Sequence, residues 1–598
     1  MAGLISIISF TIASGITLFF IPMIIRFAGL YNLYDNPDSI KTTGSNVRAV
    51  ELPRKVHKSP IPRIGGLGIV SGAVFVILGV SYFYRNGQIF KISLASLAIF
   101  ILGFLDDLYS LPPKSRFYFQ LIISSIGLWA SHLWISKIAI FSFFSLTLPA
   151  PWGFLFSLFI VVGAINAINL MDGLDGLAGG LVIIGTALLS FQYFVLTQDI
   201  EVIAIFSIPI IGATLGFLKY NTFPATIFMG DGGSNWLGYM MGVLILIVLK
   251  SESYLGSFIF QGALGPGAVS VKTISIVSVL MCFAVPIFDS ASVIFSRFLS
   301  GNSLVKADQR HFHHRLLRIG LSHKESVTAI YFIALVLGSS GLIPIVYPKY
   351  NLEWVPFLAS TIFILWTPTG RKRAWKFYNE VSSIKRFLAS ERRVSGKINT
   401  FLRYWSNINR YIVYMLLVAP TFFVGVPPRV FGYAAVVGFG IMLISTIFRF
   451  GRDDFINSLM LSIGASILLM ANNQNEMFVE LMGQKYNIQL IYNGFFTFLF
   501  ISTLSYIIVS MKRSYFLFTP SDFLLLMMPL LLFLVPDPYR RLYRIDTIGL
   551  RCLVLFMVFR FIAKRRYHTL FRIRFIIMAT LLYTVLISLF GMRIVYLQ

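Results

Sequence analysis

Apolar runs recur along this chain from end to end, and they restrict its fold more than any other feature. A helix that crosses a bilayer needs about 20 predominantly apolar residues, and the runs here measure about 16–25. Of the 598 residues 57% are hydrophobic and 12% are charged, whereas soluble domains carry about 25% charged residues. The sequence therefore predicts an all-α, polytopic integral membrane protein.

The spacing of the runs predicts about eleven transmembrane helices before residue 370 and about six or seven more after residue 410. The first eleven are expected to begin near Leu4, Leu67, Ile92, Phe119, Phe154, Leu177, Val202, Trp236, Ile274, Ala329 and Val355. We read the first run as a spanning helix rather than a cleaved signal, because it lacks a basic region and a small-residue cleavage site. This predicts a membrane domain at residues 1–370, a basic cytoplasmic linker at 371–410 and a second membrane domain at 411–598. The second domain contains no recognisable set of catalytic residues. We therefore favour a scaffold for partners, with a glycan polymerase-like or assembly module as the alternative.

Basic residues account for the net charge of +26 and gather in a few loops. The positive-inside rule and anionic lipids explain them better than nucleic acid does, so no nucleic-acid partner is expected. The loops then assigned to the cytoplasm are 31–63, 106–116, 170–176, 221–234 and 300–326. The proline-braced loop 54–66 would pre-order Lys58 and its neighbours, although attraction to lipid headgroups explains its charge equally well.

Acidic residues collect at the ends of these predicted helices, on the same membrane face. Asp231 lies in a glycine-rich turn, residues 228–234, where glycine lets the backbone approach a ligand closely. A carboxylate there suits a hard cation such as Mg²⁺, although a solvated interfacial acid would give the same pattern. Asp106 and Asp107 end another apolar run. Two adjacent carboxylates in low dielectric favour a nearby cation, with a solvated helix end as the alternative.

Two further polar groups have the composition of a binding site. Asn166, Asn169 and Asp172 are three residues apart, so they are neighbours on successive helical turns, and Asp175 follows in a glycine-containing turn. Their amides and carboxylates can bind a nucleobase or a sugar. The histidines of segment 308–315 lie among arginines. Without cysteine partners they favour phosphate oxygens over zinc, and a solvated basic loop is the alternative.

Together these segments resemble the polyprenyl-phosphate N-acetylhexosamine-1-phosphate transferases of glycosyltransferase family 4. That family includes the WecA-like enzymes and the phospho-N-acetylmuramoyl-pentapeptide transferases. The matching segments, in the family's order, are RKVHKSPIPRIGG, FLDD, NAINLMDGLDGLAGG, KYNTFPATIFMGDGGS and RHFHHRLL. The resemblance covers the first predicted domain and implies nothing about the second.

The resemblance implies a reaction in the bacterial cytoplasmic membrane that starts a cell-envelope glycan. A polyprenyl phosphate, such as undecaprenyl phosphate, would attack the β-phosphate of a UDP-N-acetylhexosamine and release UMP, with Mg²⁺ or its substitute Mn²⁺ as cofactor. One phosphoanhydride is broken and one is made, so catalysis would consist of positioning and charge neutralisation. Direct attack is preferred to a covalent aspartyl intermediate, because Mg²⁺ and a base suffice.

Roles follow from the resemblance, position by position. Asp231 would be the Mg²⁺ ligand with Asp107 beside it, and Asp106 would orient or deprotonate the lipid phosphate. Phe228 is expected to stack on uracil, and His313 is expected to act in catalysis with the three acids. The remaining expected substrate-binding residues are Lys58, Asn169, Asp172, Asp175, Asn221, His311, His314 and Arg315.

Two differences within the family affect the expected donor. Phe312 separates His311 from His313, whereas the muramoyl-pentapeptide enzymes carry three consecutive histidines, so UDP-GlcNAc is the expected donor. Gly232-Gly233 followed by Ser234-Asn235 stands where many relatives have Asp-Ser-Gly-Ser.

The muramoyl-pentapeptide transferase is the alternative within the family, and a transporter or flippase with the acids as coupling-ion sites is the alternative of another class. The sequence leaves open whether the protein forms a homodimer.

Overall fold

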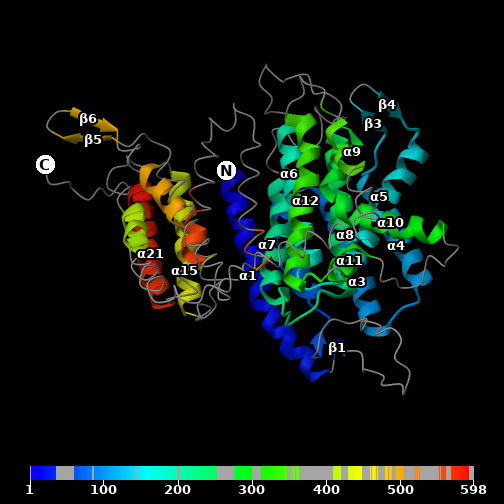
Figure 1. Ribbon diagram of the computed structural model, residues 1–598, viewed down its shortest axis with the longest axis horizontal. Helices are drawn as coiled ribbons and strands as arrows, with labels where there is room; N and C mark the ends of the chain where they lie inside the picture. The colour runs from blue at the N-terminus through cyan, green and yellow to red at the C-terminus, as the bar shows by residue number, and fades with distance from the viewer. Residues whose placement is uncertain are drawn as a thin grey trace. The chain divides into compact units, whose positions relative to one another are not determined.

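The computed structural model describes residues 2–31, 33–35, 60–83, 86–141, 144–197, 202–251, 275–299, 311–318 and 320–346, with shorter stretches between 352 and 361 and between 408 and 590. The chain divides into two compact units (Figure 1). One comprises Ala2–Tyr378 with Thr519–Leu524, and the other Asn379–Phe518 with Leu525–Gln598. The division falls inside the predicted basic linker, while the predicted domain boundaries stay a prediction.

The first unit is built almost entirely of helices. They are α1 (Ala2–Leu30), α2 (Gly66–Phe83), α3 (Gly87–Tyr109), α4 (Pro113–Ser131), α5 (Ala150–Met171), α6 (Leu177–Thr197), the π-helix η1 (Ile203–Ser207), α7 (Ile208–Asn221), α8 (Gly230–Lys250), α9 (Ile276–Leu280), the 3₁₀-helix η3 (Met281–Phe283), α10 (Ala284–Leu299), α11 (Phe312–Arg318) and α12 (His323–Val346). Short antiparallel ladders pair β1 (Tyr34–Asp35) with β2 (Ile61–Pro62), and β3 (Lys137–Phe141) with β4 (Phe144–Thr147).

The predicted membrane fold is confirmed by these helices. Eight helices within the described part of the chain are long and apolar enough to cross a membrane. Every predicted helix start that lies in the described residues falls on a helix. The protein is therefore an all-α, multi-pass membrane protein, and the predicted total number of spans stays a prediction.

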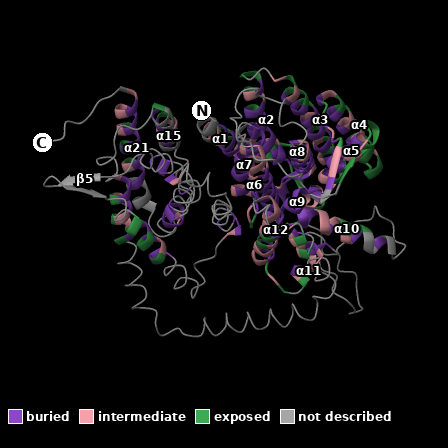
Figure 2. Ribbon diagram, turned by 90° about the horizontal axis from the view of Figure 1, so that it is seen from above, coloured by how far each residue is buried: buried purple, intermediate pink, exposed green. Residues whose placement is uncertain are grey.

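Helix α8 is the most enclosed of these eight spans, and it carries Asp231 in its first turn. Its glycines allow close packing. A Cβ on Gly238 would lie 2.5 Å from the Cα of Ile165, and a Cβ on Gly242 would lie 2.7 Å from the Cα of Val161. Helix α5 therefore packs directly on α8, while α2, α3 and α6 cover its other sides (Figure 2). Close packing on several sides fixes the start of α8, and with it Asp231.

In the second unit, α15 (Arg429–Ile447) lies beside α21 (Tyr567–Phe590) (Figure 1). The close approach again uses a glycine, since a Cβ on Gly432 would lie 2.3 Å from Oγ of Ser588. A short hairpin pairs β5 (Phe478–Leu481) with β6 (Gln484–Asn487). The predicted role of this region as a scaffold stays a prediction.

Candidate active site

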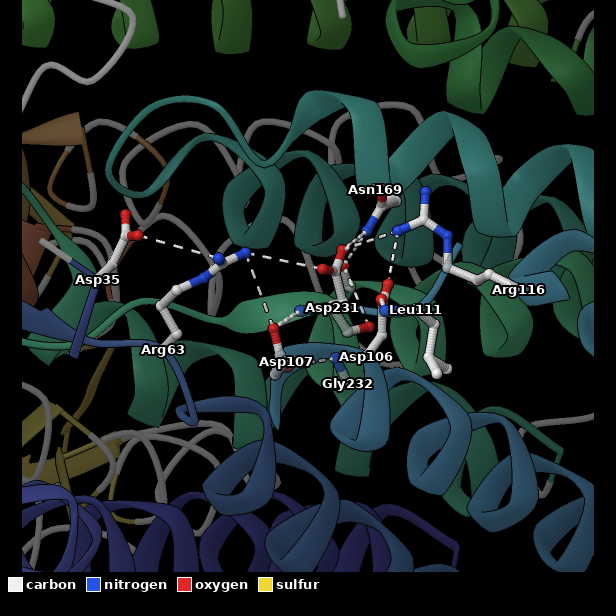
Figure 3. Close-up of polar contacts among 10 residues, drawn as sticks. Asp35, Arg63, Asp106, Asp107, Leu111, Arg116, Asn169, Asp231 and Gly232 are labelled. Carbon is white, nitrogen blue, oxygen red and sulfur yellow. Dashed lines mark hydrogen bonds and ion pairs between the residues drawn. The ribbon is translucent and has the colours of Figure 1, made fainter. Parts of the chain in front are cut away.

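The end of α3 is joined to the start of α8 by one carboxylate. Oδ1 of Asp107 accepts the backbone N–H of Asp231 at 2.8 Å, and Oδ2 accepts that of Gly232 at 2.9 Å (Figure 3). N–H groups in the first turn of a helix have no partner within the helix, and a carboxylate also suits the positive end of the helix dipole. The approach needs Gly103, where a Cβ would lie 2.4 Å from the carbonyl oxygen of Asp231. Asp107 therefore fixes the backbone that carries Asp231.

The side chain of Asp231 faces an amide and two guanidinium groups. Nδ2 of Asn169 donates to Oδ1 of Asp231 and also to Oγ of Ser234. Nη2 of Arg63 lies 3.7 Å from Oδ2, and Nη1 of Arg116 lies 3.7 Å from Oδ1 (Figure 3). The side chain of Asp231 is still 20% exposed, so a ligand can reach it. We call the following residues the charged cluster: Arg63, Asp106, Asp107, Arg116 and Asp231.

Asp106 holds one of the two arginines in place. Its Oδ2 accepts Nη1 of Arg116 at 2.7 Å, and its Oδ1 accepts the backbone N–H of Leu111 at 2.7 Å. The turn between α3 and α4 is left-handed at Ser110, with φ 52°. Both oxygens of the buried Asp106 thus bind groups of the protein, and their effect is to direct Arg116 towards Asp231.

Arg63 lies among three carboxylates, at 3.9 Å from Asp35, 3.8 Å from Asp107 and 3.7 Å from Asp231. Burial lowers the pKa of Arg63, but these carboxylates and that of Asp172 raise it more, so the pKa lies above its usual value. The guanidinium is therefore charged at any physiological pH.

The residues predicted for the site included neither Arg63 nor Arg116. Position in the sequence could have indicated both, because Arg63 lies within the motif RKVHKSPIPRIGG and Arg116 lies in the predicted cytoplasmic loop that follows FLDD. Backbone pairing brings Arg63 to the site. Gly65 N–H donates to the carbonyl of Phe228 at 2.9 Å, and Gly66 N–H donates to that of Met229 at 2.8 Å. The segment before α2 is thereby joined to the segment before α8, and the ring of Phe228 stays partly exposed.

A second group of polar side chains makes hydrogen bonds to the backbone of neighbouring loops. Oδ1 of Asn221 accepts the N–H of Gly176 at 2.9 Å, and its Nδ2 donates to the carbonyl of Ile227 at 2.9 Å. Oδ2 of Asp175 accepts the N–H of Ala225 at 3.0 Å. We call Asp175 and Asn221, together with the loops 172–176 and 221–229 that they join, the loop clamp. Asn221 is 3% exposed, and both its amide oxygen and its amide nitrogen bond the backbone. Its expected place near the diphosphate stays a prediction.

Asp172 lies at the end of α5, in the first loop of the loop clamp, and interacts electrostatically with Arg63 and Asp231 of the charged cluster. Burial raises the pKa of Asp172 to about 7, the negative charges of Asp231 and Asp175 raise it too, and Arg63 opposes the shift. Near neutral pH this carboxyl therefore exists both as an acceptor and as a protonated donor.

Residues 311–315, which we call the late segment, reach the site at Gly173. A Cβ on Gly173 would lie 2.5 Å from Nε2 of His313, so only a glycine admits this ring. His313 is 2% exposed. Burial lowers the pKa of His313 well below its usual value, as do the neighbouring His314, His311 and His323. The ring is therefore neutral at neutral pH.

Four predicted residues remain to be placed. His311 is buried directly before α11. His314 and Arg315 are half-buried on α11, and the rings of His313 and His314 lie 4.3 Å apart. Lys58 lies outside the described residues.

The oxygen atoms of Asp231 fit a magnesium ion that substrate phosphates would also help to bind. No group of three His, Cys, Asp or Glu side chains in the described part of the chain is arranged to hold a metal ion on its own. Mg²⁺ is commonly bound through one or two carboxylates together with substrate phosphates, and the partly exposed Asp231 beside the amide of Asn169 suits this arrangement. Asp107 can offer only the lone pairs that its two backbone hydrogen bonds leave free.

Known proteins share the segments that build this site. The family model for glycosyl transferase family 4 matches residues 89–249. A probable undecaprenyl-phosphate N-acetylglucosaminyl 1-phosphate transferase of Bacillus subtilis (strain 168) is 34% identical over 313 residues, which cover 51% of this chain and 79% of that protein. The undecaprenyl-phosphate alpha-N-acetylglucosaminyl 1-phosphate transferase of Escherichia coli (strain K12) is 29% identical over 59% of this chain and 91% of its own length.

A third relative comes from another bacterial group. The decaprenyl-phosphate N-acetylglucosaminephosphotransferase of Mycolicibacterium smegmatis (strain ATCC 700084 / mc(2)155) is 33% identical over 47% of this chain and 72% of its own length. The match to residues 89–249 includes the ends of α3, α5 and α7 and the starts of α4 and α8, which carry the loop clamp and every member of the charged cluster except Arg63. On this identity and coverage, the chain belongs to glycosyl transferase family 4.

Proposed function

We propose that the protein transfers N-acetylglucosamine 1-phosphate from UDP-N-acetylglucosamine to a polyprenyl phosphate and releases UMP. The relatives' names support this donor over a muramoyl-pentapeptide and support an enzyme over a transporter. The structural observation that carries the proposal is the position of Asp231, which is partly exposed and lies between an amide and two guanidinium groups. The guanidinium groups can bind the anionic oxygens of a diphosphate. The carboxylate can hold the divalent cation that accompanies the diphosphate.

The two arginines are suited to bind phosphate oxygens. Transfer between two phosphate groups depends on in-line positioning and on neutralising negative charge. Both guanidinium groups lie 3.7 Å from Asp231, beyond a normal hydrogen bond. They can therefore bind phosphate oxygens without first breaking a close bond to that carboxylate. Asp106 would keep Arg116 in place during the reaction, and its bonds to Arg116 and Leu111 support a role in orienting the lipid phosphate through Arg116 over proton abstraction.

The cofactor of this reaction would be Mg²⁺, with Mn²⁺ able to replace it. Bound Mg²⁺ neutralises charge on the diphosphate as a Lewis acid. Asp231 would hold it with Asp107 as a further ligand, and Asn169, which donates to Asp231, would bind the nucleotide. The partly exposed Phe228 would stack on uracil, Asp172 and Asp175 would bind the nucleotide, and His311, His313, His314 and Arg315 would approach the sugar phosphate from the late segment.

The expected location is the bacterial cytoplasmic membrane, with the charged cluster on the cytoplasmic face. The loops that carry Arg63 and Arg116 are the basic ones, and basic loops stay in the cytoplasm. A nucleotide-sugar made in the cytoplasm could then reach Asp231 directly, while the lipid phosphate would arrive from the bilayer.

A transfer assay on the purified full chain tests this proposal. Radiolabelled UDP-GlcNAc, undecaprenyl phosphate and Mg²⁺ should yield labelled lipid and UMP in equal amounts. Removing divalent cations with EDTA should stop the reaction, and excess Mg²⁺ should restore it. UDP-N-acetylmuramoyl-pentapeptide serves as the comparison donor. Absence of both products, or a preference for the comparison donor, would refute the proposed activity.

A further inference from the structure

A buried carboxylate outside the charged cluster binds the first histidine of the late segment. Asp289 lies on α10 and is 4% exposed. Its Oδ2 lies 2.9 Å from Nδ1 of His311, and its Oδ1 accepts the backbone N–H of Phe312 at 2.7 Å. A carboxylate inside an apolar spanning helix is costly. Both of its oxygens are used to hold two adjacent residues at the start of α11.

From this contact we infer that Asp289 is a positioning residue of the transferase, which selects the nitrogen that His311 offers to the substrate. The inference rests on the proposed function of the site. A carboxylate accepts hydrogen bonds, so Nδ1 of His311 carries the proton of this contact. Nε2 is the nitrogen that remains for the sugar phosphate, and the hydrogen bond at the other nitrogen sets its state.

Ring packing connects this contact to the nucleotide side of the site. The rings of His311 and His313 are nearly parallel, with centroids 5.8 Å apart and an interplanar angle of 10°. His313 in turn packs on Gly173, next to Asp172. A rotated or displaced His311 would therefore disturb the histidine that contacts the 172–176 loop. No sequence motif pointed to Asp289, because its partners follow 22 residues later.

The exchange Asp289→Asn isolates this role. The Asn side chain has nearly the same shape, and its oxygen can still accept the N–H of Phe312. Its amide N–H group would face Nδ1 of His311, so the imidazole proton would move to Nε2. We expect kcat/KM to fall about 10- to 100-fold, by analogy with metal-bound histidines, for which loss of the partner at the second nitrogen has an effect of this size.

Two measurements test the inference. In a double-mutant cycle, Asp289→Asn should cost less than about twofold in a His311→Gln background, because the carboxylate acts through the imidazole. Nitrogen-15 NMR of labelled histidine should show His311 protonated at Nδ1 in the wild type and at Nε2 in the Asn variant. The chain has 7 histidines, and the His311 signal is the one absent from His311→Gln. Ser292→Ala is the matched control on α10, since it removes a hydrogen bond to the Asp289 carbonyl and leaves the carboxylate contacts intact.

The outcomes separate the two proposals. A wild type that forms no labelled lipid refutes the proposed function, whereas the tautomer of His311 is measured without turnover. An active wild type whose Asp289 and His311 effects multiply refutes the positioning role. A wild-type His311 that is protonated at Nε2 also refutes it, and that result does not depend on the folding of any variant.

Discussion

The charged cluster and the loop clamp lie at the same face of the first unit and both contain aspartates, but these aspartates have different partners. In the charged cluster, Asp231 faces the guanidinium groups of Arg63 and Arg116 and stays partly exposed. In the loop clamp, Asp175 and Asn221 face backbone N–H and carbonyl groups. A carboxylate with charged partners and open access can exchange those partners for a substrate. A side chain that bonds backbone groups of two loops holds the loops in place, and only its remaining lone pairs and N–H groups are left for a ligand.

This comparison predicts that substitutions in the charged cluster reduce the rate and that substitutions in the loop clamp reduce stability. The change Asp231→Asn should have the largest effect, about 10³-fold in kcat, comparable with the loss of a strong electrostatic contact in other enzymes. The amide keeps an oxygen for Asn169, so the fold should survive. Labelled lipid formation at saturating Mg²⁺ measures the effect. A rate within threefold of the wild type would remove Asp231 from the metal site.

Arg116→Gln should lower kcat/KM by about 10- to 100-fold, because hydrogen bonds to charged groups contribute about 1.5–3 kcal/mol. The matched control is Lys114→Gln, an exposed basic residue in the same turn of α4. It should leave the rate nearly unchanged. Equal losses in the two variants would mean that general loop charge, and not the contact of Arg116 with Asp106 and Asp231, supports turnover.

Gly173→Ala should lower kcat about tenfold, because the added Cβ would lie 2.5 Å from Nε2 of His313 and overpacking of this kind typically costs about 1–3 kcal/mol. The matched control is Gly163→Ala on α5, where a Cβ would meet nothing within 4 Å. The assay is the same transfer reaction, with thermal unfolding measured alongside. Normal turnover in Gly173→Ala would show that the ring of His313 is not needed against the 172–176 loop.

Asn221→Ala should have the smallest effect on rate, within about twofold in kcat for the folded protein, and should instead lower stability by about 1–3 kcal/mol. It leaves the N–H of Gly176 and the carbonyl of Ile227 without their partner. The control is Thr226→Ala, which removes an exposed hydrogen bond in the same loop. A collapse of kcat at unchanged thermal stability would instead place Asn221 in contact with the diphosphate, as its motif predicts.

The sequence predicted the helices and the acidic residues of the site, but the residues predicted for the site did not include the arginines or Asp289. The helices were predictable because hydropathy is a local property, and the segments that carry Asp106, Asp172 and Asp231 followed from the motifs. Arg63 and Arg116 escaped prediction because a basic residue in a cytoplasmic loop usually needs no explanation beyond topology. Asp289 escaped because its hydrogen-bond partners are remote in the chain and no spacing pattern connects them.

The amino-acid sequence by itself determined that this chain is a helical membrane protein and that its acids, amides and histidines lie at one end of its spans. Those properties depend on runs and spacings within single segments. Only the tertiary structure decided which of these polar groups retain free lone pairs. Asp107 uses its oxygens on the start of α8, Asn221 uses its amide on two loops, and Asp231 is left partly exposed between two guanidinium groups. The physical reason is that each hydrogen bond occupies a donor or a lone pair that a ligand would otherwise use. The partners that saturate a side chain come from segments up to 125 positions away.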